Sequence, residues 1–310
     1  MLDIAIITQN NYTNAYQTQR LKEEFTKLKT KPTVIPAESI ILKYEQNILT
    51  YYSKTPSIIE PFNYFDLYVF REIFSVMKDM ITTIQILKNK NAKVFDNNLT
   101  KTFYLNDKLK EGEQLLANNI NFPKTLHFMD KQNLLNNLDF LEQTLNAYPI
   151  IAKKRSSGKG LGIYKINSRK ELIKFAEQLC NEHKYKENAI KLFIFQEFLN
   201  IEKEYRVFVV GQKIVGAMQR IPKQGDFRAN FSLGGTVKPA QITKHMQEIS
   251  LKAHKAVLTE ISGVDYAITK DNNYYILEVN RTPGFKGLEQ ATGKNIAYEI
   301  AKYLLEKYKQ

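Results

Sequence analysis

Short apolar segments alternate with amphipathic ones in the first third of the chain. Residues 4–8 and 33–36 have the pattern of buried strands, residues 18–28 that of a helix, and residues 67–71 that of a further strand ending in Arg71. This alternation predicts an α/β lobe with a parallel sheet over residues 1–96. Ligands of such sheets contact the carboxyl ends of strands, so Arg71 is a candidate substrate residue, although a surface arginine is the commoner explanation.

The pattern becomes helical over residues 97–147. Four leucines there share one helical face: Leu134, Leu138, Leu141 and Leu145. A short apolar strand follows at residues 150–154, and the run Ser168-Arg169-Lys170-Glu171 has the spacing of a capping box ahead of another helix. These elements predict a small central α+β lobe over residues 97–189.

From residue 190 onward apolar side chains recur at every second position between short turns, as on either side of Gly211-Gln212. This period predicts an antiparallel sheet, which helices over residues 243–259 and 295–307 would cover. The whole chain is therefore predicted to be an α/β (α+β) protein whose third lobe spans residues 190–310.

Composition favours an ordinary globular protein, with 43% apolar and 25% charged residues among 310. No apolar run reaches the ~18 residues of a membrane span, and the first residues do not resemble a signal peptide, so we expect a cytoplasmic protein without a membrane partner. The single cysteine, Cys180, lies in a predicted helix and is expected to be a plain thiol rather than a nucleophile.

The net charge of +13 is compatible with nucleic acid, acidic protein or phosphate ligands. Because the lysines are spread evenly, a compositional bias of the source is an alternative, and no basic block resembles a nucleic-acid motif. We expect an anionic substrate rather than nucleic acid. The sequence leaves the oligomeric state open, including a homo-oligomer.

The segment from residue 263 to residue 280 predicts a hairpin with a polar turn. If the turn is centred between Asp271 and Asn272, Asp265 faces Glu278 across the strands at about 5 Å, and Asn280 shares their face. Opposed carboxylates in an apolar hairpin need a cation, a shared proton or open solvent. Oxygen donors without His or Cys favour Mg²⁺ or Mn²⁺ bridging substrate phosphates over zinc, and a solvated acidic face is the alternative.

A glycine loop follows the strand that ends at Lys153. Backbone amides around Ser157, Gly158 and Gly160 could close over phosphate while Lys153 supplies a charge. The spacing matches neither the Walker loop nor the dinucleotide fingerprint. In a second loop, residues 225–230, Arg228 and Asn230 could clamp a phosphoryl group or an anionic intermediate, although a surface loop is the commoner explanation for such a segment taken alone.

The order of these segments, together with Gln196-Glu197-Phe198-Leu199 and the run Leu277-Glu278-Val279-Asn280, closely resembles the ATP-grasp superfamily, and within it the RimK-like α-L-glutamate ligases that include the ribosomal protein modification enzyme. The resemblance covers residue 108 to the C-terminus and, more loosely, the first lobe. It implies an ATP-grasp fold.

The resemblance also implies site roles. Lys108 and Lys153 would contact the nucleotide phosphates, the hinge around Phe198 would hold adenine, and Glu204 would meet the ribose. Arg228 and Asn230 would be catalytic, with Arg228 reaching the terminal phosphate. Two Mg²⁺ or Mn²⁺ ions would be held by Asp265, Glu278 and Asn280. The full ATP-binding set would be Lys108, Lys153, Ser157, Gly158, Gly160, Gln196, Glu197, Phe198, Leu199, Glu204, Arg206 and Arg228.

The implied activity is ATP-dependent ligation of a carboxylate to an amine through an acyl phosphate, with L-glutamate as the favoured amino acid and a protein C-terminus, peptide or small acid as the carboxylate. A peptide or cofactor ligase with another amine is the near alternative. A non-catalytic ATP-binding module is the alternative from another class, against which the full site set argues. Arg281 and Thr282 replace residues of the family pattern Asn-Ala-Ser-Pro-Gly and are candidate substrate contacts.

Overall fold

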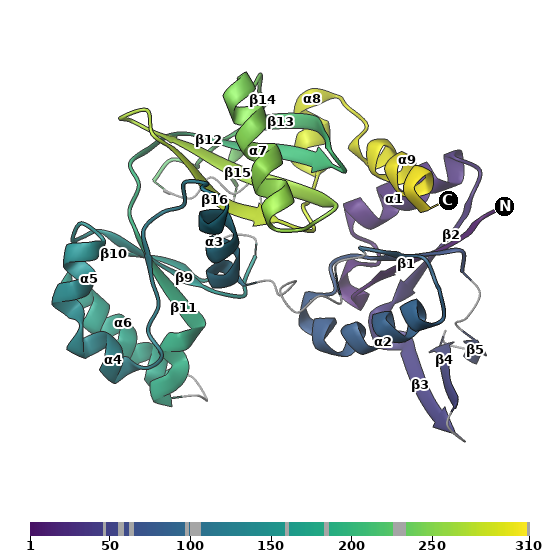
Figure 1. The fold of residues 1–310 in the computed structure, drawn as a ribbon, viewed down its shortest axis with the longest axis horizontal. Coiled ribbons are helices and arrows are strands. Elements are labelled where there is room, and N and C mark those ends of the chain that lie inside the picture. The colour runs from purple at the N-terminus through teal and green to yellow at the C-terminus, as the bar shows by residue number, and fades with distance from the viewer. Residues whose placement is uncertain are drawn as a thin grey trace.

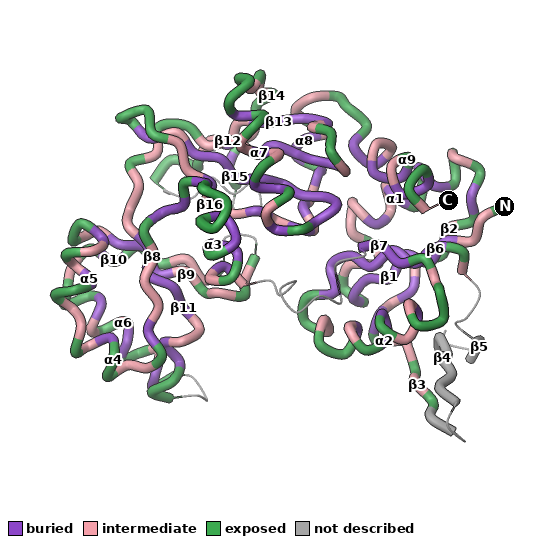
Figure 2. Tube along the Cα trace, in the orientation of Figure 1, coloured by how far each residue is buried: buried purple, intermediate pink, exposed green. Residues whose placement is uncertain are grey.

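The computed structural model has three lobes (Figure 1). It describes residues 1–45, 48–54, 59–61, 65–96, 99, 107–158, 161–182, 186–225 and 234–308. Within these ranges, no helix is both long and apolar enough to cross a membrane. Buried residues follow the strands of the lobes and the helix faces turned toward them (Figure 2).

The N-terminal lobe is built on a parallel sheet, as predicted. Its strand order is β2-β1-β6-β7, made by Asp3–Thr8 (β1), Lys31–Pro36 (β2), Leu67–Phe70 (β6) and Val94–Phe95 (β7). Helices Tyr16–Lys27 (α1) and Met77–Asn89 (α2) cover its two faces. Ile4 and Ile6 pack on the α1 side and Ala5 and Ile7 on the α2 side, because side chains alternate along a strand.

A three-stranded antiparallel sheet extends from this lobe and was not predicted. It consists of Ile40–Glu45 (β3), Ile48–Lys54 (β4) and Ile59–Pro61 (β5), paired in that order. Figure 1 shows β3 and β4 projecting away from the parallel sheet.

The central lobe has a four-stranded antiparallel sheet in the order β10-β9-β11-β8. Its strands are Thr125–Leu126 (β8), Ile150–Lys154 (β9), Ile163–Ile166 (β10) and Phe193–Glu197 (β11). The expected leucine face is confirmed, but the helix is divided at Asn137 into Lys131–Asn136 (α4) and Leu138–Thr144 (α5). Asn137 lies outside helical geometry at φ −124°, which ends the first helix.

The capping box is confirmed at the start of helix Arg169–Glu182 (α6). The Glu171 backbone N–H donates to the Ser168 hydroxyl at 3.2 Å, and the Glu171 carboxylate accepts from the backbone N–H of Asn167, one residue before Ser168, at 2.8 Å. Cys180 is buried on this helix, where burial raises the pKa of its thiol, as fits a core thiol.

The C-terminal lobe is a five-stranded antiparallel sheet, which confirms the predicted pairing. Its order is β14-β13-β12-β15-β16, from Ile201–Val210 (β12), Lys213–Ile221 (β13), Thr236–Pro239 (β14), Ile261–Thr269 (β15) and Tyr274–Asn280 (β16). Helices Lys108–Ala117 (α3) and Lys244–Ala256 (α7) pack on one face. Even-numbered residues of β12 therefore point to the opposite face.

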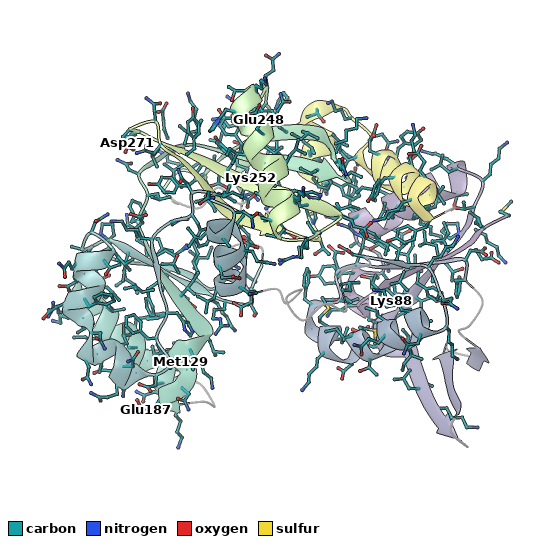
Figure 3. The ribbon with its side chains drawn as sticks, in the orientation of Figure 1. Lys88, Met129, Glu187, Glu248, Lys252 and Asp271 are labelled. Carbon is teal, nitrogen blue, oxygen red and sulfur yellow. The ribbon has the colours of Figure 1, made fainter. Side chains whose placement is uncertain are left out.

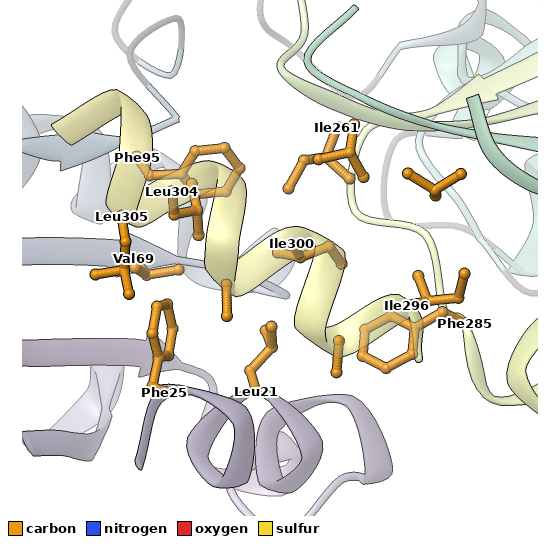
Figure 4. Packing of buried hydrophobic residues seen from close by; sticks show 14 of the residues in the cluster. Leu21, Phe25, Val69, Phe95, Ile261, Phe285, Ile296, Ile300, Leu304 and Leu305 are labelled. Atoms are coloured by element: carbon orange, nitrogen blue, oxygen red, sulfur yellow. The ribbon is translucent and has the colours of Figure 1, made fainter. Parts of the chain in front are cut away.

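The C-terminal helix connects two lobes. Helices Lys286–Thr292 (α8) and Ile296–Tyr308 (α9) follow β16, and α9 packs between α1 and strands β12 and β13. One core cluster holds Leu21 and Phe25 of α1 together with Ile300 and Leu304 of α9 (Figure 4). Helix α9 thus covers the antiparallel sheet only in part. The predicted lobe boundaries near residues 96 and 189 stay a prediction.

Candidate active site

The β15–β16 hairpin brings the predicted carboxylates opposite each other. Asp265 pairs with Glu278, and Gly263 pairs with Asn280. Nearer the turn, however, Tyr266 pairs with Ile276, so Leu277 is the extra residue of a β-bulge. Ile276 and Val279 both face the α3–α7 core, whereas Leu277 and Glu278 both line the cleft. The bulge therefore turns Glu278 away from the core and toward the cleft.

Two arginines neutralise Asp265. Arg206 makes a bidentate contact, with Nε 2.7 Å from Oδ1 and Nη2 2.8 Å from Oδ2. Arg220 reaches the same Oδ2 at 2.9 Å and also donates to Glu204 at 2.7 Å. Among the described residues, two guanidinium groups therefore offset the repulsion between Asp265 and Glu278. The sequence did not reveal these partners.

The pKa values around this cluster follow from burial and charge. Burial alone would raise the pKa of Asp265, but Arg206 and Arg220 hold it below its ordinary value. Burial raises the pKa of Glu204, and the Asp265 charge adds to this effect while Arg220 opposes it. The cluster therefore holds Asp265 ionised.

A lysine connects the glycine loop to the hairpin. Lys108 Nζ donates to the Ser157 carbonyl at 2.8 Å and lies 3.7 Å from Glu278 Oε1. Lys153, at the end of β9, faces the same region, and burial is the main cause that lowers the pKa of its ammonium to about 8. Anionic phosphates would stabilise both charges.

A cavity of about 260 Å³ lies between the central and C-terminal lobes. Its walls include Ile151, Ile163 and Leu277, as suits a planar base, and the predicted hinge residues Gln196, Glu197, Phe198 and Leu199. Lys108, Lys153 and Glu204 line it as well. The structure thus brings most of the predicted nucleotide set to one cavity.

A larger cavity, about 900 Å³, lies between the N-terminal and C-terminal lobes. Tyr12, Glu72 and Lys78 line it from one lobe and Asn280, Thr282 and Lys286 from the other. The two cavities share a wall formed by Ser157, Gly158, Leu161, Arg220 and Glu278. A group transferred past Glu278 would pass from one cavity to the other.

Three buried polar atoms on these walls have no partner among the described residues. They are Gln196 Oε1 in the smaller cavity, Thr282 Oγ1 in the larger one, and Arg220 Nε in their shared wall. Buried polar atoms are normally hydrogen-bonded, so these three atoms fit a site that is completed by a polar ligand.

The donor set fits a magnesium ion shared with phosphate. Glu278 and Asn280 offer oxygen atoms to the cavity, and no group of three or more His, Cys, Asp or Glu in the described ranges could hold a metal unaided. Mg²⁺ commonly takes one or two carboxylates and completes its shell with phosphate and water oxygens. Asp265 fits the role of a metal ligand less well, because both its carboxylate oxygens already accept hydrogen bonds from arginine.

Two residues of the site were missed from the sequence. Arg220 carried a signal, because a charged residue near the end of the apolar strand β13 is unusual. Glu111 on α3 is buried and accepts from the Val279 amide at 3.0 Å, between Glu278 and Asn280. Burial, then the Glu278 charge, raise the pKa of Glu111 to about 7. Its position three residues after Lys108 was the only sequence signal.

The remaining candidates lie in different places. Arg71 is buried and donates to the Pro283 carbonyl at 3.2 Å, linking the lobes. Arg281 turns away from the cleft, toward Gln114 at 3.2 Å, so the structure does not place it at the substrate. Thr282 lines the larger cavity. Three predicted site residues lie outside the described residues: Gly160, Arg228 and Asn230.

The fold agrees with that of known ligases. The ATP-grasp ligase PsnB, in a structure with a variant of its minimal precursor, Mg and ADP, superposes with a TM-score of 0.70 at 15% identity, covering 99% of this chain and 100% of PsnB. The three lobes therefore have the ATP-grasp fold.

The family follows from sequence comparison. The model of the RimK-like ATP-grasp domain matches residues 105–304, and the chain belongs to this family of ATP-dependent ligases. The coenzyme gamma-F420-2:alpha-L-glutamate ligase of Methanococcus maripaludis is 30% identical over 73% of this chain and 76% of its own length. A probable alpha-L-glutamate ligase of Hahella chejuensis is 27% identical over 98% and 96%. The family uses ATP and magnesium.

Proposed function

We propose that this ligase activates a carboxylate as an acyl phosphate and joins it to the amine of an amino acid, with L-glutamate as the favoured amine. The observation that carries the proposal is the shared wall of the two cavities. A nucleotide in the smaller cavity would present its terminal phosphate at Glu278 and Arg220, where a carboxylate in the larger cavity can reach it. Enforced proximity of this kind supplies much of a ligase's rate.

The nucleotide would be held at both ends. Apolar walls and the Gln196 amide would take adenine, while Lys108 and Lys153 would meet the phosphates. Glu278 and Asn280, with Asp265 if its arginines release it, would hold Mg²⁺, which neutralises phosphate charge during transfer. From the sequence, Arg228 and Asn230 would meet the transferred phosphoryl group.

The reaction needs no protein nucleophile. A carboxylate oxygen attacks the terminal phosphorus, and the bond to the leaving ADP oxygen breaks. The neutral amine nitrogen then attacks the acyl carbon, the carbon–oxygen bond to phosphate breaks, and phosphate leaves with the electron pair and with the proton that the nitrogen loses. Arg220, buried between both cavities, is placed to stabilise negative charge in either step.

The preference for glutamate rests on two supports. Both relatives above are named as α-L-glutamate ligases. In addition, Lys78 and Lys286 line the larger cavity from opposite lobes, where they favour anionic substrates. The PsnB structure contains a variant of its minimal precursor, and a cavity of about 900 Å³ also has room for a peptide carboxylate.

An ADP-release screen with Mg²⁺ tests the proposal. The panel would pair L-glutamate, L-glutamine and L-lysine with acids of three kinds: small dicarboxylates, peptides ending in glutamate and cofactor acids. ADP release that requires both an acid and L-glutamate, with a new amide seen by mass spectrometry, is the expected result. A different obligatory amine would overturn the glutamate assignment, and ADP release without any amide would overturn the ligation.

A further inference from the structure

Arg155 joins the central lobe to helix α3, which packs on the C-terminal sheet. Its backbone N–H donates to the Leu192 carbonyl at 2.8 Å and its Nη1 to the Lys191 carbonyl at 3.2 Å, so the central lobe holds the residue in place. On the other side, Nε donates to Asp107 Oδ1 at 3.0 Å and Nη2 pairs with Asp107 Oδ2. The guanidinium therefore bridges two lobes through a bidentate ion pair, which is a strong and directional contact.

Further hydrogen bonds extend this contact to the nucleotide cavity. The Lys108 backbone N–H donates to the Arg155 carbonyl at 3.2 Å, and Lys108 Nζ donates to the Ser157 carbonyl at 2.8 Å. Asp107 also caps α3, because its Oδ1 accepts from the backbone N–H of Leu109 at 3.0 Å. The start of α3 is thus fixed against residues 155–157 by side chains and backbone together.

The ion pair brings two positive charges close to each other. Lys108 follows Asp107 on α3, and Lys153 lies two residues before Arg155 at the end of β9, so the lysines line the smaller cavity from different lobes. Burial is the main cause that lowers the pKa of Lys153, and the Lys108 charge lowers it further. Without a phosphate between them, the two ammonium groups repel and favour separation of the lobes. The Asp107–Arg155 pair opposes that separation.

Partial burial distinguishes this ion pair from one on the surface. The side chains of Arg155 and Asp107 are 28% and 14% exposed, whereas those of Arg169 and its partner Asp139 are 45% and 91% exposed. Solvent and salt screen exposed pairs, which therefore contribute little. Burial alone would raise the pKa of Asp107, but Arg155 holds it below its ordinary value, so both partners stay charged.

We propose that the Asp107–Arg155 ion pair holds the central and C-terminal lobes together before nucleotide binds, and that Arg155 is a positioning residue for Lys108 and Lys153. This inference rests on the proposed function and deepens it. Arg155 is not among the described residues that line either cavity, so it acts through the two lysines instead of touching the nucleotide. Mg·ATP then meets a site whose two sides are already in place, which raises its apparent affinity.

Calorimetry of Mg·ATP binding, without acid or amine, tests this role. Arg155→Met removes the ion pair and keeps a long apolar side chain, and we expect it to bind Mg·ATP about tenfold more weakly than the wild type. Asp107→Asn removes the charge but keeps a residue that caps helices well, and it should show a smaller loss in the same direction. The double variant should bind no more weakly than Arg155→Met, because both changes remove one contact.

Arg169→Met is the matched control, because the ion pairs of Arg169 with Asp139 and Glu142 stay within the central lobe. It should bind Mg·ATP as the wild type does. Equal affinity of Arg155→Met and the wild type would overturn the inference, and so would losses from Arg155→Met and Asp107→Asn that add in the double variant.

Small-angle scattering separates positioning of the lobes from a local structural role. Without nucleotide, Arg155→Met should have a larger radius of gyration than the wild type. With saturating Mg·ATP the two radii should be equal, because the bound phosphates then link the lobes. A difference that persists at saturation would contradict the inference. These measurements contain neither acid nor amine, so they decide the role of Arg155 even where the ligation fails in the screen above. If the wild type binds no Mg·ATP, the inference fails together with the nucleotide site.

Discussion

Asp265 controls the charge balance at the base of the cleft. Its side chain is only 6% exposed, and the side chains of Arg206 and Arg220, which contact it, are 11% and 4% exposed. Glu278, opposite it on β16, is 28% exposed and forms one ion pair within the described part of the chain, with Lys108 at 3.7 Å. The two carboxylates therefore have different physical roles, although they occupy one face of one hairpin.

Removing each charge should separate these roles. Asp265→Asn leaves Arg206 without its anion and Arg220 with Glu204 alone, and we expect a loss of about 3–5 kcal/mol in the free energy of unfolding, measured with urea and no nucleotide. Glu278→Gln should unfold within about 1 kcal/mol of the wild type, because its side chain is partly exposed, yet lose about 10²-fold or more in turnover.

Asp271→Asn, at the exposed tip of the same hairpin, is the control and should change neither quantity (Figure 3). An Asp265→Asn protein as stable as the wild type would show that the arginines do not depend on Asp265, and a role as metal ligand alone would then explain the residue better.

Lys153 should make nucleotide binding depend on pH. Its pKa of about 8 in the fold lies below the ordinary 10.5, so the unfolded chain binds more protons between these values and stability should rise with pH across that window. Bound phosphates would raise the pKa again. At pH near 8, Mg·ATP binding should therefore take up roughly half a proton.

Calorimetry in two buffers of different ionisation enthalpy measures this uptake. Lys153→Met should abolish it and weaken binding, whereas Lys154→Met, at the exposed neighbouring position, should preserve both. Proton uptake that survives in Lys153→Met would assign the titration to another group.

At the scale of elements, the bulge at Leu277 explains why Asp265 and Glu278 lie opposite each other in the β15–β16 hairpin. The turn is not centred as the sequence suggested, since Ile268 pairs with Tyr274, but the extra residue restores the expected pairing of Asp265 with Glu278. Alternation alone could not predict this, because Leu277 has the pattern of an ordinary apolar strand residue.

The central lobe shows the same limit for a helix. A period of 3.6 residues identified its leucine face but not the break at Asn137, which depends on local backbone geometry.

Helix α3 holds strand β16 through Glu111, and this contact should respond to pH. Its pKa of about 7 lies above the ordinary 4.5, so the folded protein retains a proton that the unfolded chain has lost, and stability should fall as pH rises between these values. Glu111→Gln removes this dependence and keeps an oxygen for the Val279 amide. We therefore expect it to gain about 1 kcal/mol or more relative to the wild type between pH 5 and pH 8.

Urea denaturation at both pH values measures the gain. Glu113→Gln, on the exposed side of the same helix, should show none, and Glu111→Ala should lose stability at both pH values because the buried Val279 amide is left unpaired. A gain for Glu111→Gln that is equal at pH 5 and pH 8 would contradict the assigned titration.

At the scale of the molecule, the parallel sheet of the first lobe and the antiparallel sheet of the third were predictable from their hydrophobic patterns, while the packing between lobes was not. The helix pattern of α9 indicates a buried face but not which lobe that face meets. In the structure it joins Phe25 of α1 to Phe208 of β12 in one core. The three-stranded extension after β2 was missed for a related reason, since short strands near Ile40 and Ile59 resemble loop segments in isolation.

The cores predict that the chain unfolds in two cooperative units. One cluster joins the N-terminal lobe, α9 and the C-terminal sheet, whereas the cluster of the central lobe contains only residues between 126 and 195. Arg155 of the central lobe forms an ion pair with Asp107 at the start of α3. Since cooperativity follows shared core, calorimetry of the ligand-free protein should show two transitions.

Matched core variants assign the two transitions. Leu172→Ala in the central lobe and Ile300→Ala in α9 each empty a fully buried site, which costs about 2–5 kcal/mol. Leu172→Ala should lower one midpoint and Ile300→Ala the other. Mg·ATP should raise the central-lobe midpoint and bring the two together, because the proposed nucleotide site takes Lys153 from one unit and Glu278 from the other. A single transition that both variants shift equally would contradict the prediction of two units. It would show that the connection at residues 197–200 couples the unfolding of the lobes as strongly as a shared core does.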